Sequence, residues 1–315
     1  MTSLTKMERK SEVLSVIAPK LEPILETNIQ NEFGRLKSAI VNRGSSVNDQ
    51  TRRIFSETIT MDVLGEKKVL NDEQKEFIKQ DNLRIIKQVG TFIDLLRDNG
   101  VNLIFAEDVK DAFGQFFTRD VGFVVGRAFC IASRKSEIRQ TELSGLIKIL
   151  PHIQKAFIIN KGVIEGGDVL INGSDVYVGL SKKTNEKGLQ SFKIIAEGEG
   201  FEVILILLKK SVLHLDCAFN MLSDKLAIVH PWAIEKGLMQ LESDFELISV
   251  TSHEAVRLAT NLLVLDKGVI VSDNQNIRVN SLLRDRGFKV HELPYDAVIR
   301  SGGSFRCTVL PLLRE

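Results

Sequence analysis

A unit of strand, turn, strand, helix and strand recurs along this chain at intervals of about fifty residues, and this repeat constrains the fold more than any other feature. The clearest copy is near the C-terminal end, where residues 262–265 and 269–271 are typical of a β-hairpin. The helical pattern of residues 275–286 then ends at Gly287, and residues 288–293 alternate as a strand. Each copy therefore predicts a small α/β unit.

The same order of elements is found in four earlier stretches. Residues 168–208 and 121–160 repeat it well, the latter with a helix expected near 137–149 and a strand near 156–159, while 213–259 is the least regular copy. Nearest the start, residues 37–41 predict a strand and residues 71–99 a long helix that Gly100 ends, with a strand over 101–105.

Five such units around an axis would form an α/β propeller and bring their strand–helix junctions to one central cleft. An ordinary doubly wound α/β sheet also fits the periodicity. Residues 1–30 have apolar side chains at helical spacing, interrupted by Pro19 and Pro23, and predict a helical extension that packs on the main domain or on a partner subunit. Residues 31–315 are expected to form a single catalytic domain.

Composition excludes several classes of protein. The chain is 43% hydrophobic and 26% charged. Its net charge of +1 lacks the excess of positive charge that is typical of proteins that bind nucleic acid or an anionic membrane. Three cysteines argue against a disulfide framework and for a reducing compartment. The first residues lack a secretory apolar region, and the best apolar run, residues 201–208, is too short to span a membrane. A cytoplasmic location is expected.

Four short motifs lie at the edges of the predicted units. They are Phe117-Thr118-Arg119-Asp120, Glu165-Gly166-Gly167-Asp168, His214-Leu215-Asp216-Cys217, and the segment from Ser301 to Thr308 that contains Cys307. Taken singly, each has an ordinary explanation as a turn, a surface ion pair, a structural histidine or a buried inert thiol. Their meaning depends on whether the fold brings them together.

Together the motifs meet the needs of guanidine chemistry. Two carboxylates, Asp120 and Asp216, could hold a planar guanidinium by charge-assisted hydrogen bonds. The thiolate of Cys307 could attack its carbon, and His214 could protonate the departing nitrogen while Glu165 orients the imidazole. These five residues fill the five required roles.

Cys307 has a sequence context that suits a reactive thiol. The pair Gly302-Gly303 permits unusual backbone conformations, and Arg300 and Arg306 supply positive charge that would favour the thiolate. By contrast, Cys130 and Cys217 are interpreted as small core hydrophobes, and the scattered histidines predict no zinc site. Neither a metal nor a cofactor is expected.

These motifs carry a family resemblance. The chain resembles the guanidino-group-modifying superfamily, which includes arginine deiminase, dimethylarginine dimethylaminohydrolase and the amidinotransferases. The matching segments, in the family's order, are FTRD (117–120), EGGDVL (165–170), VGLSKKTN (178–185), HLDCAF (214–219) and GGSFRCTVLPLLR (302–314).

The resemblance implies a five-bladed α/β propeller and a covalent thiouronium-type intermediate formed without metal or organic cofactor. It assigns Cys307 as nucleophile, His214 as acid/base, Glu165 as its partner, and Asp120 and Asp216 as guanidinium clamps. Asp168 is counted with the substrate-binding residues.

The chain departs from the family's pattern at the residue that binds the substrate carboxylate. The usual arginine is Lys183 here, and a lysine offers a point charge without the bidentate fork, which puts free L-arginine in doubt as the substrate. Arg139 is a second candidate for binding a carboxylate.

The leading hypothesis is a cysteine hydrolase that acts on arginine or a related guanidine and releases ammonia or an amine with a ureido product. Alternatives are an amidinotransferase and a non-catalytic binding module, since a propeller of this kind also serves as a ribosome-binding translation factor. A cysteine peptidase is disfavoured because carboxylates beside the nucleophile would oppose an oxyanion. The expected partner is a small guanidino substrate rather than nucleic acid or a membrane, and a homo-oligomer is left open.

Overall fold

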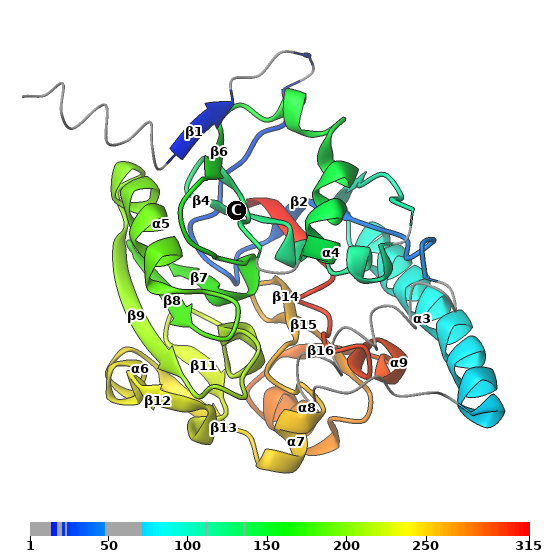
Figure 1. The fold of residues 1–315 in the computed structure, drawn as a ribbon. Coiled ribbons are helices and arrows are strands. Elements are labelled where there is room, and N and C mark those ends of the chain that lie inside the picture. Colours follow the sequence, from blue (N-terminus) through cyan, green and yellow to red (C-terminus); the bar gives the residue numbers. More distant parts are fainter. Residues whose placement is uncertain (1–13, 18–20, 23, 48–70, 111, 135–136) are drawn as a thin grey trace, which may run out of the picture.

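In the part of the chain that the structure describes, five small sheets are arranged in a ring (Figure 1). The computed structural model describes residues 14–17, 21–22, 24–47, 71–110, 112–134 and 137–315. Within each sheet one antiparallel pair of strands is followed by a parallel partner, as the repeat in the sequence predicts. The predicted α/β propeller is therefore confirmed.

The first sheet joins the two ends of the chain and closes the ring. It consists of β17 (Leu310–Arg314), β2 (Leu36–Val41) and β3 (Asn102–Phe105), with β17 antiparallel to β2. The C-terminal strand thus completes the unit that the N-terminal strands begin.

The other four sheets follow the chain in order. Their strands are β4 (Gly122–Val125), β5 (Ala128–Ile131) and β6 (Ala156–Ile159); β7 (Val169–Asn172), β8 (Asp175–Leu180) and β9 (Glu202–Leu208); β10 (Phe219–Met221), β11 (Leu226–Val229) and β13 (Glu246–Ser249); and β14 (Leu263–Asp266), β15 (Val269–Asp273) and β16 (Lys289–Leu293). One further strand, β12 (Ile234–Lys236), crosses from the fourth unit to pair with β9.

Helices connect the strands within the units and also connect some units to the next. They are α3 (Asp72–Asp98), α4 (Glu137–Gln140), α5 (Glu186–Gly198), α6 (Leu238–Asp244), α7 (Ser252–Val256), α8 (Ile277–Asp285) and α9 (Asp296–Ile299). Of these, α7 and α9 connect one unit to the next. The long helix α3 begins at a capping box made by Asn71 and Gln74, and its buried face includes Ile85, Val89, Phe92, Ile93 and Leu96. In the described part of the chain, none of the helices is long and apolar enough to cross a membrane.

The helix predicted over residues 137–149 is wrong for most of its length. Only α4 is α-helical, and the chain continues in 3-10 turns at Thr141–Leu146 and Leu150–His152. A Cβ atom on Gly145 would lie 2.4 Å from the side chain of Gln115, so a glycine is needed where these segments meet. Pro151 also opposes a continued helix.

The N-terminal prediction also requires correction. Residues Leu14–Ile17 form a strand, β1, that pairs antiparallel with the outer edge of β6. The unpaired edge of β6 offers backbone hydrogen bonds, and these outweigh a weak local helical pattern. Residues 1–13, 18–20 and 23 lie outside the described residues, so the division into an extension and a main domain stays a prediction.

Candidate active site

The four sequence motifs occupy equivalent places in four units, directly before the first strand of each. Three of them form 3-10 turns, at Thr118–Asp120 before β4, Gly166–Asp168 before β7 and Leu215–Cys217 before β10. Cys307 lies in the turn before β17. Because the units surround one axis, equivalent positions converge, and residues almost two hundred apart meet.

Hydrogen bonds connect these motifs to one another. The backbone N–H of Arg119 donates to the carbonyl of Cys307 at 3.0 Å, and its guanidinium donates to the carbonyl of Gly166 at 3.1 Å. The N–H of Leu215 donates to Asp168 Oδ1 at 2.8 Å. The relative positions of the motifs are therefore fixed by the backbone as well as by side chains.

Both glycines of the segment 165–168 are required by close packing. A Cβ on Gly167 would lie 2.7 Å from Cγ of His214, and one on Gly166 would lie 2.3 Å from the carbonyl oxygen of Arg119. These distances exclude any side chain. The glycine pair is thus what allows the imidazole to pack directly over the turn.

His214 and Glu165 form a buried acid–base pair. His214 Nε2 lies 3.0 Å from Glu165 Oε2, and each side chain is only 1% exposed. Burial opposes a charged imidazole, but the hydrogen bond to Glu165 and the carboxylates of Asp120 and Asp168 outweigh it and raise the pKa of His214 to about 10.

Glu165 is correspondingly held ionised. Burial would raise its pKa, but the hydrogen bond from His214 and the charge of Arg134 lower it to about 2. At neutral pH the pair is therefore an imidazolium and a carboxylate, with Nε2–H donating to Glu165 and a proton available on Nδ1.

Asp120 faces the other nitrogen of the imidazole. Its Oδ1 lies 4.0 Å from His214 Nδ1, and both atoms are buried without a hydrogen-bond partner in the described structure. Buried polar atoms are normally paired, so this gap is suited to a polar group that donates to Asp120 and receives a proton from His214. A guanidine nitrogen can do both.

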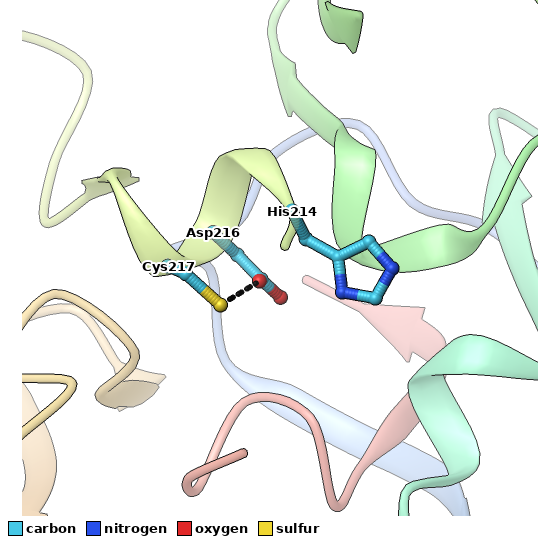
Figure 2. Close-up of side chains that lie close together, drawn as sticks. All are labelled: His214, Asp216 and Cys217. Atoms are coloured by element: carbon cyan, nitrogen blue, oxygen red, sulfur yellow. Dashed lines mark hydrogen bonds between the residues drawn. The ribbon is translucent and has the colours of Figure 1, made fainter. Parts of the chain in front are cut away.

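Asp216 and Cys217 lie beside His214, as Figure 2 shows. Asp216 Oδ1 is 3.6 Å from the Cys217 sulfur, and the ligand atoms of all three side chains lie within 4.8 Å of one another. Asp216 is therefore a further carboxylate near the imidazole, besides Asp120 and Glu165.

Each of these two carboxylates is already paired through its other oxygen with an arginine of the chain. Arg139 Nη1 donates to Asp120 Oδ2 at 2.9 Å, and Arg306 Nη1 donates to Asp216 Oδ2 at 2.9 Å. Such pairs fix the planes of the two carboxylates. The remaining Oδ1 of Asp120 faces His214 Nδ1, and that of Asp216 accepts from the Cys217 thiol.

Arg134 is a central cation that the sequence reasoning overlooked. Its side chain is fully buried, pairs with Glu142 and donates to the carbonyl of Arg139 at 2.9 Å. Its remaining N–H groups point toward Glu165 at 3.7 Å and Asp120 at 4.0 Å. Glu142, also overlooked, has a lowered pKa because Arg139 and Arg134 outweigh the effect of burial. No short motif in the sequence marks either residue.

Three predicted substrate-binding residues have other partners here. Arg139 contacts Asp120, Glu142 and the carbonyl of Gly114, while both oxygens of Asp168 are used by the N–H of Leu215 and the hydroxyls of Ser181 and Thr184. Burial raises the pKa of Asp168 to about 7, against the effects of His214 and these hydrogen bonds. Lys183 lies half-buried in the loop after β8, where its N–H donates to Ser181 Oγ. Their roles toward a substrate stay predictions.

Cys307 is buried beside the aromatic side chains of Phe117 and Phe305. Its N–H donates to Asn261 Oδ1 at 3.3 Å. Gly302 has a φ of +99°, and a Cβ on Gly303 would lie 2.5 Å from the ring of Phe117, so this turn needs both glycines.

The two arginines near Cys307 differ in what they contact. Arg306 pairs with Asp216 and Glu32, and Cys307 is among the groups that keep its pKa raised against burial. Arg300 instead pairs with Asp81 of α3 and with Asp296 of α9. The prediction that both support the thiolate is therefore wrong for Arg300.

The two remaining cysteines also differ. Cys130 is fully buried in the core, as predicted, and burial raises the pKa of its thiol. Cys217 is not a core residue: it is half-buried and lines a surface cavity, and its interaction with Cys307, together with burial, raises its pKa.

Two sets of three side chains have the spacing of a metal site, namely His214, Asp216 and Cys217, and Asp120, Glu165 and His214. They share His214, whose Nε2 is bonded to Glu165, and arginines already pair with both aspartates. Carboxylates balanced by buried arginines are less typical of a cation site than of a site that recognises a guanidinium.

Comparisons with known proteins agree with this chemistry. The profile of the family described as N,N dimethylarginine dimethylhydrolase, eukaryotic, matches residues 20–314. The uncharacterized protein YkgA of Bacillus subtilis (strain 168) is 35% identical over 256 residues, which cover 79% of this chain and 87% of that protein. The arginine deiminase of Listeria welshimeri is 27% identical over 252 residues, 64% of this chain and 61% of that enzyme.

A solved structure shares the fold at lower sequence identity. The N-terminal domain of ArgZ, an arginine dihydrolase from the ornithine–ammonia cycle in cyanobacteria, bound to product, has a TM-score of 0.73 at 19% identity over 88% of this chain and 97% of that one. The same domain has been solved covalently bound to a reaction intermediate.

Proposed function

The chain belongs to the dimethylarginine dimethylhydrolase family, within the pentein superfamily of guanidino-modifying proteins, and on that premise we propose that it is a cysteine hydrolase of a guanidine substrate. The observation that carries the proposal is the arrangement of Asp120, His214 and Glu165. Two buried, unpartnered atoms face each other at 4.0 Å there, while Glu165 holds the far side of the imidazole at 3.0 Å.

Substrate binding would use the two aspartate oxygens directed toward the centre. Asp120 Oδ1 and Asp216 Oδ1 accept N–H groups of the guanidinium, while Arg139 and Arg306 hold the opposite oxygens in place. This keeps the substrate cationic and presents the flat face of its carbon to Cys307.

In the first half-reaction the Cys307 thiolate attacks the guanidinium carbon and forms a C–S bond. A C–N bond then breaks, and the proton on His214 Nδ1 goes to the departing nitrogen, which leaves as ammonia or an amine. Glu165 stabilises the imidazolium before the transfer and keeps Nε2 protonated after it. A thiouronium adduct remains on Cys307.

In the second half-reaction water adds to the carbon of the adduct. His214, now neutral, takes a proton from that water, the C–S bond breaks, and the thiolate leaves. The products are a ureido compound and free enzyme with its imidazole protonated. The second proton of the added water is taken up by the released amine, so that overall one guanidinium and one water give one protonated amine and one neutral ureido product.

The proposal is tested by incubating the protein with a panel of guanidines and assaying the ureido product, with mass spectrometry of acid-quenched enzyme to locate an adduct. We expect product and an adduct on Cys307 for at least one guanidine, and neither with Cys307→Ala. Absence of product and adduct for every guanidine would refute a hydrolase. Product that forms only when an amine acceptor is added would show an amidinotransferase instead.

A further inference from the structure

A surface cavity of about 530 Å³ adjoins the proposed reaction centre. Leu213, Cys217 and Gly302 line it, and these residues belong to the segments that hold His214, Asp216 and Cys307. The cavity thus touches the histidine segment on both sides and the turn that precedes the nucleophile. Its volume is in the range of small-molecule binding sites.

Cys217 connects this cavity to the reacting groups. Its sulfur lies 3.6 Å from Asp216 Oδ1, and Cys307 is among the groups that raise its pKa. A molecule that enters the cavity and passes Cys217 would therefore reach the carboxylate and the thiol assigned to the guanidine group. The geometry suits a substrate whose guanidine lies at the centre and whose tail lies in the cavity.

The walls of the cavity are apolar and uncharged. Among the described residues that line it there is no lysine, arginine, aspartate or glutamate. Its polar members are two serines, Cys217 and His230, whose Nδ1 is 3.4 Å from the carbonyl of Val250. The other side chains are aliphatic or aromatic, including Val212, Trp232, Val256 and Ile299.

A free amino-acid tail would bind unfavourably in a cavity with such walls. A free α-amino acid carries an ammonium and a carboxylate, and moving both from water to an apolar site is costly without charged partners. Lys209, which lies over the ring of Trp232 at 3.8 Å, could meet only the carboxylate. An uncharged tail gains instead from contact with the exposed faces of Trp232 and Val256, which are 58% and 81% exposed.

We propose that this cavity is the subsite for the substrate tail, and that it selects guanidines with an uncharged alkyl or aryl-alkyl tail over free amino acids. The inference rests on the proposed hydrolase function and adds the class of substrate. It assigns a specificity role to Trp232 and Val256, which lie outside the catalytic groups.

The first test compares matched guanidines that differ only in the tail. Butylguanidine and phenethylguanidine have uncharged tails, agmatine a cationic one, 4-guanidinobutyrate an anionic one, and L-arginine both charges. We expect kcat/KM for the first two to exceed that for arginine at least tenfold, mainly through KM. Equal values, or a preference for arginine, would overturn the inference.

The second test places a charge in the cavity. Val256→Arg should raise kcat/KM for 4-guanidinobutyrate relative to butylguanidine at least threefold, because it supplies a partner for the carboxylate. Met239→Arg is the matched control, since Met239 is 84% exposed and does not line the cavity. A ratio that changes equally in both variants would overturn the tail subsite.

The outcomes separate the two proposals. Ureido product and a Cys307 adduct with arginine as the best substrate would support the hydrolase and refute the apolar tail subsite. If no guanidine gives product or adduct, the hydrolase proposal fails, and the inference fails with it.

Discussion

The two sides of the proposed site are built from different physical interactions. The acid–base side consists of Asp120, Arg134, Arg139, Glu142, Glu165 and His214, all buried and linked by ion pairs. The thiol side consists of Asp216, Cys217, Cys307 and the adjoining cavity, whose lining is uncharged among the described residues.

We infer from this difference that the acid–base side serves the reaction, whereas the cavity on the thiol side determines which substrate binds. On the acid–base side, each charge is held by a neighbour, so a change at one residue leaves another charge buried and unpaired. On the thiol side, the contacts are weak and the cavity walls are apolar, so a substitution there should have little effect on the other residues of the site. We therefore expect mutations on the acid–base side to alter pH dependence and stability, and those around the cavity to alter substrate choice.

The largest effect is expected at the one thiol-side residue that takes part in bond formation. Cys307→Ala should lower kcat by about 10⁴-fold or more, because it removes the sulfur that forms the proposed covalent adduct. Turnover and adduct formation are the measurements. Cys130→Ala, a change at a core thiol, should keep turnover; substantial activity in Cys307→Ala would place the nucleophile elsewhere.

On the acid–base side, Glu165→Gln should lower kcat by about 10³-fold or more, because the imidazolium loses its carboxylate partner. The sign of the pH effect follows from the raised pKa of His214, about 10, to which the bond with Glu165 contributes. Without that carboxylate the pKa falls, so activity should be lost at lower pH on the alkaline limb than in the wild type. An unchanged alkaline limb would show that Glu165 does not set the protonation of His214.

Arg134 gives a smaller but distinctive prediction. Arg134→Gln leaves Glu142 and Glu165 without their shared cation and should lower the free energy of unfolding by about 3–5 kcal/mol and kcat by about 10–100-fold. Arg134→Lys should recover much of the stability, since it keeps the charge, but less of the activity, since it lacks the planar fork. Denaturant unfolding and kcat measure the two effects. Equal recovery of both would assign Arg134 a purely structural role.

The smallest effect is expected at Cys217. Its thiol makes only a weak hydrogen bond, to Asp216 Oδ1, so Cys217→Ala should slow labelling of Cys307 by an electrophilic amidine less than about tenfold at neutral pH. Mass spectrometry of the Cys307 peptide measures the rate separately from labelling at other thiols. If the labelling rate of Cys307 falls in Cys217→Ala by as large a factor as kcat falls in Glu165→Gln, the comparison between the two sides is wrong.

Most of the fold could be predicted from the sequence because strand, turn and helix signals are local. The hairpin near residues 262–273, the capped helix α3 and the strand β9 were all found at or close to their expected positions. The failures were at places where the surroundings decide: β1 forms because β6 has a free edge, and the segment after α4 adopts 3-10 turns where Gly145 packs on Gln115.

The candidate site was only partly predictable. Motif order pointed to Asp120, Glu165 and His214, which the structure brings together around one imidazole. Arg134 and Glu142 were missed because their types and spacing match any exposed helix, and nothing in the sequence says that they are buried. Cys217 was misjudged because only the packed turns reveal its contacts with Asp216 and Cys307.

The sequence by itself determined the repeated unit, the residues that end each element and the chemical types placed before four of the strands. Only the tertiary structure decided which charges pair, which thiol meets the surface and where an uncharged cavity adjoins the centre. The physical reason is the separation along the sequence over which each interaction acts. Backbone preferences act over a few neighbouring residues, whereas ion pairs and burial depend on segments that meet only after the ring of sheets closes.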